Sequence, residues 1–166
     1  MLKRNTYAVM AGVLLALGSS SVLAADAETQ AQLDALKAAI PKFAVPMREV
    51  GGRFQDMYFA AKGGNWALAA YMSKYMNGAM NPAALTKPKE YKMWKDFYVN
   101  DFAMVNKAIQ AKDMKAFEES YTKAIVTCNE CHETMKYQFI KVVKKKTAPG
   151  NNIDFTLKTE PNIVPD

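Results

Sequence analysis

Residues 114–135 read MKAFEESYTKAIVTCNECHETM and carry the clearest helical pattern of the chain. Apolar side chains return at alternating steps of three and four, which is the repeat of one face of an α-helix. Asp113 precedes the stretch and is a residue type that caps helix N-termini. The stretch therefore predicts a long amphipathic helix whose inner face includes both cysteines of the chain. That face comprises Met114, Phe117, Tyr121, Ala124, Cys128, Cys131 and Met135.

Three amphipathic stretches precede this helix along the chain. They cover residues 47–61, 68–79 and 90–109, the last beginning near Glu90. Gly63-Gly64 and Asn81-Pro82 separate the first two from their successors, and Asn65 is a suitable N-cap for the second. Four amphipathic helices with short connections predict an all-α fold, an antiparallel four-helix bundle.

The two ends of the chain differ from this central pattern. A short extra helix with Leu33, Leu36 and Ile40 on one face is expected to stop at Pro41. Residues 137–143 fit either a strand or a continuation of the last helix. We assign residues 25–147 to the bundle. Residues 148–166 are polar and contain several prolines, which predicts an extended tail that lies on the bundle or is partly disordered.

Residues 1–24 have the features of a secretory signal peptide. Lys3 and Arg4 give a positive start, and the apolar run Ala8–Leu17 is too short to span a bilayer. Small residues lead to a predicted cleavage near Ala24. The short apolar run indicates export to a bacterial periplasm, and no other segment is long and apolar enough to predict a membrane span. Because that compartment oxidises free thiols, its cysteines are expected to be paired or chemically used.

The segment Cys128-Asn129-Glu130-Cys131-His132 is a C-x-x-C-H motif, the sequence to which haem is attached in c-type cytochromes. Two thiols three residues apart can add to the two vinyl groups of one porphyrin. The adjacent imidazole then lies under the iron. Cys128 and His132 are four residues apart and share a helix face, so the porphyrin is expected in the apolar seam of the bundle. The motif predicts one covalent haem c, with His132 as the proximal iron ligand.

Other uses of these residues fit the sequence less well. A zinc site takes four ligands, and Cys128, Cys131 and His132 supply only three. A thioredoxin-like cysteine pair lies at a helix start after a strand, whereas this pair lies deep in a helix. A disulfide between positions three apart in a helix has poor geometry.

Composition narrows the partners and the chemistry. The formal net charge is +6, but the basic residues form no stripe interleaved with aromatic residues, so nucleic acid is not an expected partner. Lys141, Lys144, Lys145 and Lys146 form a basic patch that either steers an acidic redox partner or is an ordinary solvated run. His132 is the only histidine, which leaves no distal acid–base residue for a peroxidase. The chain is therefore not expected to be an enzyme.

An attachment motif near the end of the last of four helices resembles the class II c-type cytochromes, the cytochrome c prime-like family. The segment Met47-Arg48-Glu49-Val50-Gly51-Gly52 is similar to the first-helix segment of that family. The resemblance implies that Met47 lies over the distal face of the haem. It also implies that Lys136 is the basic residue beside the proximal histidine, and that homodimers through the first two helices are an option.

The identity or absence of a sixth iron ligand distinguishes two candidate functions. In an up-down bundle the haem level meets four methionines, Met47, Met76, Met80 and Met93, of which the resemblance favours Met47. Thioether ligation raises the reduction potential and closes the iron to gases, which predicts one-electron transfer between redox partner proteins. The alternative is a five-coordinate haem protein that binds small gases such as NO and CO in the manner of cytochrome c prime.

Overall fold

The computed structural model describes residues 26–150 and 152–158. Within these residues the only regular elements are helices, which confirms the predicted all-α class. None of the helices in this part of the chain is both long enough and apolar enough to cross a lipid bilayer. The predicted signal peptide, residues 1–24, lies outside the described residues.

The chain divides into two compact units, with the boundary between Ile40 and Pro41. In the first unit residues 26–39 are helical, which is the short helix expected before Pro41. Every residue of this helix is exposed, including Leu33 and Leu36. Its apolar face is therefore not buried within its own unit.

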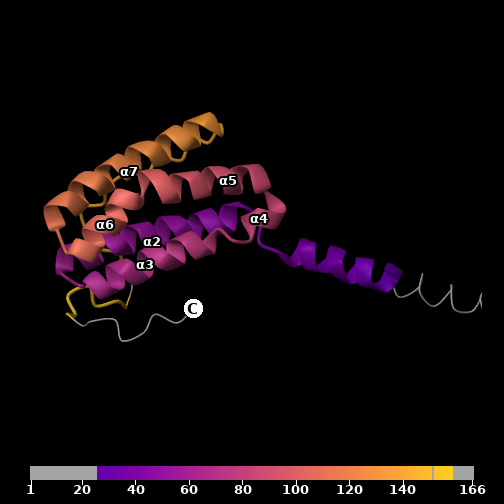
Figure 1. The fold of residues 1–166 in the computed structure, drawn as a ribbon, viewed down its shortest axis with the longest axis horizontal. Coiled ribbons are helices and arrows are strands. Elements are labelled where there is room, and N and C mark those ends of the chain that lie inside the picture. The colour runs from indigo at the N-terminus through magenta and orange to yellow at the C-terminus, as the bar shows by residue number, and fades with distance from the viewer. Residues whose placement is uncertain (1–25, 151, 159–166) are drawn as a thin grey trace, which may run out of the picture. The chain divides into compact units, whose positions relative to one another are not determined.

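The second unit begins at Pro41 and contains the remaining helices (Figure 1). They are α2 (Ala44–Gly63), α3 (Trp66–Ala79), α4 (Ala83–Thr86), α5 (Pro88–Asp96), the π-helical turn η1 (Phe97–Asp101), α6 (Ala103–Ala111) and α7 (Met114–Thr134). α2 contacts α3 and α7, and α6 also contacts α3 and α7. These four helices therefore share one hydrophobic core.

Residues with capping chemistry fix several helix ends. Gly64 follows α2 in the left-handed conformation, at φ 82°, which glycine adopts without strain. The Asn65 side chain accepts a hydrogen bond from the Leu68 amide, which confirms it as the N-cap of α3. Asp113 caps α7 in the same way by accepting from the Ala116 amide. The predicted starts of α3 and α7 are thus confirmed.

The prediction of one continuous third helix is wrong. The sequence predicts one helix over residues 90–109, but the structure has α5, η1 and α6 in its place. α5 begins at Pro88, whose fixed φ suits a first helical turn. In η1 the Phe102 amide donates to the Phe97 carbonyl five residues earlier, which widens the turn. The wider turn lets the rings of Phe97 and Tyr98 both contact Phe102, with centroids 5.6 and 5.5 Å away.

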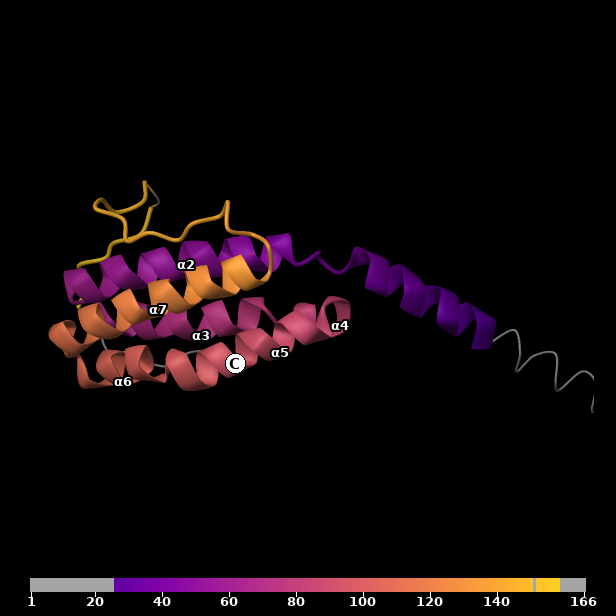
Figure 2. The same ribbon diagram turned by 90° about the horizontal axis from the view of Figure 1, so that it is seen from above.

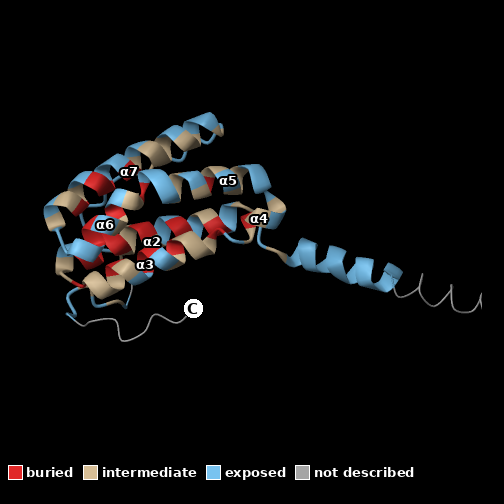
Figure 3. Ribbon diagram, viewed as in Figure 1, coloured by how far each residue is buried: buried red, intermediate tan, exposed pale blue. Residues whose placement is uncertain are grey.

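One part of the core joins α2 to the first half of α7, where both helices have buried residues (Figure 3). The rings of Phe54 and Tyr121 stack with their centroids 4.1 Å apart, and the Tyr121 hydroxyl donates to the Phe54 carbonyl. One turn further along α2, the Tyr58 hydroxyl donates to Glu118, which lies earlier on α7. Because the contacts move backward along α7 as they advance along α2, the two helices run antiparallel.

After α7 the chain reverses and returns along the second unit (Figure 2). α7 ends at Thr134, two residues before Lys136 takes a left-handed conformation at φ 64°. Residues 137–143 form turns and extended chain. They are neither of the two elements that the sequence allowed, because the helix has already ended and this segment forms no strand.

The described part of the tail contacts the C-terminal end of α2 and the N-cap of α3. The Asn65 side-chain amide donates to the Asp154 carbonyl at 3.2 Å. The rings of Phe59 and Phe155 lie 6.0 Å apart between centroids. Gly63 allows this close approach, because a Cβ at that position would meet the Phe155 carbonyl oxygen.

Candidate functional site

The C-x-x-C-H motif lies in the last two turns of α7. Cys128, Cys131 and His132 are half-buried and continue the face of α7 that is buried from Phe117 to Ala124. Beyond Ala124, however, no residue of α7 is buried (Figure 3). The apolar face of the helix therefore loses its protein cover at the level where the motif begins.

α7 ends immediately after the motif in a Schellman turn. The Tyr137 amide donates to the His132 carbonyl, and the Lys136 amide donates to the Glu133 carbonyl. Lys136 holds the left-handed position at which glycine is usual, and its side chain is exposed. The structure thus brings Lys136 to the turn that follows His132. Its role beside the imidazole stays a prediction.

The imidazole of His132 is oriented by the returning chain. Its Nδ1 lies 2.7 Å from the carbonyl oxygen of Ile140. Because a carbonyl oxygen only accepts hydrogen bonds, Nδ1 carries the proton and donates it. In the neutral ring Nε2 then has a lone pair. Histidines that ligate metals commonly donate their second ring N–H in this way, so Nε2 is prepared to act as a ligand.

Asn129, the first variable position of the motif, holds the same returning segment. Its side-chain oxygen accepts from the Val142 amide at 2.8 Å, and its side-chain amide donates to the Val142 carbonyl at 3.0 Å. Asn129 and Val142 are both half-buried, and Val142 packs against the core. Sequence reasoning missed this pairing. The partner is a backbone group 13 residues away. Because every residue has the same backbone groups, no sequence pattern indicates this contact.

Both cysteines have free thiols with raised pKa values. Burial, with a smaller contribution from the neighbouring Cys131 thiol, raises the pKa of Cys128 to about 12. Burial also raises the pKa of Cys131. Redox-active cysteines have lowered pKa values, so this environment does not suit thiol–disulfide catalysis. Within the described residues no group of three or more His, Cys, Asp or Glu side chains is arranged to hold a metal ion.

Met47 lies near the start of α2, is half-buried and packs against the core. The pairing of Phe54 with Tyr121 indicates its level in the molecule. Two turns back along α2 from Phe54 lead to Met47, and two turns forward along α7 from Tyr121 lead to Cys128. The start of α2 and the end of α7 therefore lie at the same end of this antiparallel pair.

The other methionines considered at this level differ in burial. Met76 and Met80 are 1% and 0% exposed, so both are already enclosed by the core. Met93 is half-buried on α5. Either enclosed methionine would have to leave its packing in order to bind iron, whereas Met47 and Met93 keep part of their surface accessible.

One lysine of the predicted basic patch is engaged in an ion pair. The Lys144 Nζ lies 2.8 Å from a carboxylate oxygen of Glu118 and 5.3 Å from the centre of the Tyr58 ring. The hydrogen bond from Lys144, followed by that from Tyr58, lowers the pKa of Glu118. Lys144 therefore fastens the returning chain to α7, while Lys141, Lys145 and Lys146 are exposed.

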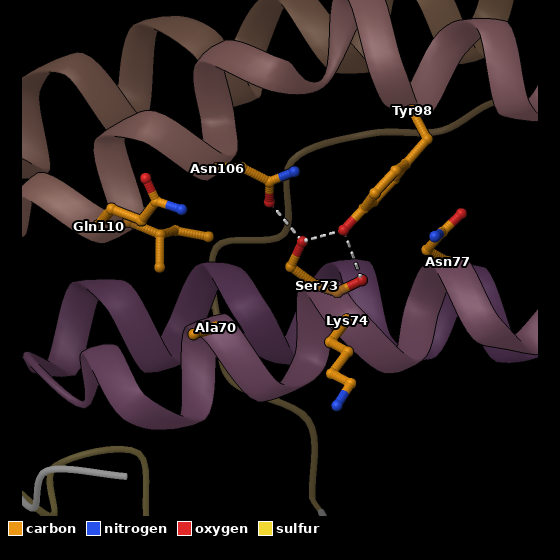
Figure 4. A pocket seen from close by; sticks show the side chains of 8 residues that line it. Ala70, Ser73, Lys74, Asn77, Tyr98, Asn106 and Gln110 are labelled. Atoms are coloured by element: carbon orange, nitrogen blue, oxygen red, sulfur yellow. Dashed lines mark hydrogen bonds between the residues drawn. The ribbon is translucent and has the colours of Figure 1, made fainter. Parts of the chain in front are cut away.

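Two shallow cavities in the second unit are lined by residues outside the motif. One, of about 280 Å³, lies between α3 and α6 (Figure 4). There the Ser73 hydroxyl bonds to the Tyr98 hydroxyl and to Asn106. The other, of about 360 Å³, lies between α2 and α3 beside Arg53 and Tyr75. In the first cavity these polar groups bond to one another, which makes it a packing feature rather than a reactive site.

The structure thus brings together the motif, the chain that returns beside it and the start of α2 at one end of the second unit. Comparison of the chain with models of protein families, with curated proteins and with solved structures finds no match. The chemistry of these residues therefore carries the functional argument.

Proposed function

We propose that the chain is an exported c-type cytochrome that carries one haem c. Thioether bonds to Cys128 and Cys131 hold the haem, and Nε2 of His132 is the proximal iron ligand. The observation that carries this proposal is the His132 Nδ1–Ile140 hydrogen bond of 2.7 Å, which leaves Nε2 available within a C-x-x-C-H motif.

The surroundings of the motif fit a large, flat apolar group. The face of α7 is buried as far as Ala124 and only half-buried at Cys128 and Cys131. A porphyrin joined to both thiols would cover this part of the face and remove apolar surface from water. When bound, the haem supplies an iron that takes up and releases one electron. The protein residues fix its attachment, orient its proximal ligand and limit its contact with solvent.

We propose that the helices form an antiparallel four-helix bundle of the class II cytochrome type. The contacts of α2 with α3 and α7, and of α6 with α3 and α7, support it. In this arrangement α5, η1 and α6 together act as the third long helix. The motif on the last helix and Met47 on the first then lie at one end of the bundle.

Met47 is the proposed distal ligand, which makes one-electron transfer the proposed activity. Its partial burial and its place near the start of α2 support this choice over the enclosed Met76 and Met80. A redox partner with an acidic surface fits the exposed lysines of the returning chain. The proposed location is the periplasm.

The absorption spectrum of the chain, matured in a cell that attaches haem, tests this function. The account expects a haem that stays with the denatured chain and, in the oxidised protein, the weak far-red band of methionine sulfur bound to ferric iron. Met47→Ala should abolish that band. Met104→Ala is a matched control, because Met104 is 58% exposed on α6.

The same spectra distinguish the rival functions. A high-spin ferric spectrum in the wild type, with carbon monoxide binding after reduction, would support the gas-binding alternative. A far-red band that survives Met47→Ala would reject Met47 as the ligand and make Met93 the next candidate. A colourless protein would overturn the proposal of a cytochrome.

A further inference from the structure

We propose that Asn129 is a positioning residue for His132, acting through residues 137–143, which we call the strap. This inference rests on the proposed role of His132 as proximal ligand. It assigns a function to a variable position of the attachment motif, which the motif itself treats as a spacer.

Besides the Tyr137–His132 backbone bond that ends α7, the strap touches the motif through two neighbouring sets of hydrogen bonds. The Ile140 carbonyl accepts from Nδ1 of His132 at 2.7 Å. Two residues further on, both backbone groups of Val142 bond to the Asn129 side chain, at 2.8 and 3.0 Å. A paired amide of this kind fixes both the place and the rotation of the strap backbone, and so it fixes the direction of the Ile140 carbonyl.

Side-chain packing contributes little to the position of the strap. Tyr137, Phe139 and Ile140 are exposed, and Phe139 is 77% exposed. Val142 is the strap residue that packs against the core. The Tyr137 amide holds the start of the strap, and the Lys144–Glu118 ion pair follows its end. Because the strap buries so little apolar surface between these points, the position of residues 140–142 depends on the pairing with Asn129.

The position of the strap affects the properties of the proximal ligand. A hydrogen bond from Nδ1 to a carbonyl orients the ring and raises the basicity of the ligating nitrogen. A more basic ligand stabilises the ferric over the ferrous state, which lowers the reduction potential. A strap released from Asn129 should therefore leave the imidazole less well oriented and the reduction potential higher.

The test compares Asn129→Ala with Glu130→Ala in the haem-containing protein. Glu130 is the other variable position of the motif and its side chain is exposed, which makes it a matched control. Asn129→Ala should raise the reduction potential and speed hydrogen exchange at the Val142 amide by about tenfold, the effect of losing bonds that together contribute about 1–2 kcal/mol. Glu130→Ala should leave both unchanged. Equal potentials in the wild type and Asn129→Ala would overturn the inference.

A second substitution removes part of the same pairing on the strap side. Val142→Pro removes the amide that Asn129 accepts from, because proline has no N–H. Its effect on the potential should have the same sign as that of Asn129→Ala, and the double variant should shift no further than the larger single shift. Shifts that add would show that Asn129 acts by another route.

The nitrogen-15 chemical shifts of the His132 ring give a readout that does not need the iron. In full-length chain without haem, the neutral ring should carry its proton on Nδ1, and Asn129→Ala should return the proton largely to Nε2. An Nδ1 proton that persists in Asn129→Ala would also overturn the inference. Failure of the proposed function gives a different result, namely a wild-type chain that never acquires haem while its His132 tautomer still depends on Asn129.

Discussion

The two halves of α7 carry one continuous amphipathic pattern but differ in what covers them. In the first half Phe117 is 0% exposed and Tyr121 is buried against α2. In the second half Cys128 and Cys131, which continue the same face, are only half-buried. Periodicity thus determines which face of a helix is apolar. Burial of that face depends on a partner, and in the described part of the chain the second half is only partly covered.

In the proposed cytochrome, this difference indicates which part of α7 the haem covers. The half with protein neighbours is a packed core, and its stability should respond to cavities. In the proposed cytochrome the half with the motif is completed by haem, so its stability should respond to haem attachment. The predictions below test this difference and the contacts around it, each with a substitution and a matched comparison.

The largest effect on the second half is expected from Cys128→Ala combined with Cys131→Ala. Without thioether bonds the second half of α7 and the strap lose their cover, so their amides should exchange at least ~10-fold faster, a loss of roughly 1.4 kcal/mol of local stability. Amides around Phe117 should change much less. Hydrogen exchange of the haem-loaded wild type and the variant measures this. Equal exchange in the second half of α7 would contradict the comparison.

Phe117→Ala should destabilise the first half strongly. Removing a fully buried aromatic ring leaves a cavity, with an expected cost of about 3–5 kcal/mol in the free energy of unfolding. Val126→Ala on the same helix should cost about 0.5 kcal/mol or less, because Val126 is largely exposed. Urea unfolding of both variants gives the comparison. Similar losses would contradict the difference in burial between Phe117 and Val126.

Asn65→Ala should cost more than Asp113→Ala, although both remove a helix N-cap. Loss of the cap itself is expected to cost about 1 kcal/mol in each case. Asn65 also donates to the Asp154 carbonyl, so its loss should bring the total to about 2 kcal/mol. Thermal unfolding ranks the two variants. Equal losses would show that the tail contributes nothing at this point.

The smallest effect concerns pH. Hydrogen bonds from Lys144 and Tyr58 lower the pKa of Glu118 below its usual 4.5. The folded chain therefore favours the carboxylate, so the stabilisation is present above pH 4.5 and is lost as the pH falls through the lowered pKa. Glu118→Gln should cost at most about 1 kcal/mol at about pH 7, because the side chain is 39% exposed, and almost nothing at about pH 3. Urea midpoints of both proteins at the two pH values measure the difference, and a gap that widens in acid would contradict the assignment.

Much of the fold could be predicted from local chemistry. Asn65 and Asp113 cap helices because their side chains reach the amide three residues later, a relation contained in a few adjacent residues. The break at η1 could not be predicted, since it depends on how Phe97, Tyr98 and Phe102 pack together in space. The short helix α4 likewise follows from the path between α3 and α5 rather than from a periodic pattern.

In the candidate site, too, local features could be predicted from the sequence and contacts between distant residues could not. The spacing of Cys128, Cys131 and His132 is visible in the sequence because the chemistry lies in side chains at fixed intervals. The partners of the motif, Ile140 and Val142, act through their backbone groups. Backbone groups are the same in every residue, so only the structure could identify which of them contact the motif.

The most direct test of the account is the mass of the denatured chain after export and maturation in a cell that attaches haem, measured together with thiol labelling. The account predicts a chain heavier by one haem, with neither Cys128 nor Cys131 open to alkylation. A chain of unmodified mass whose two thiols both react, or whose sulfurs are joined to each other, would contradict it.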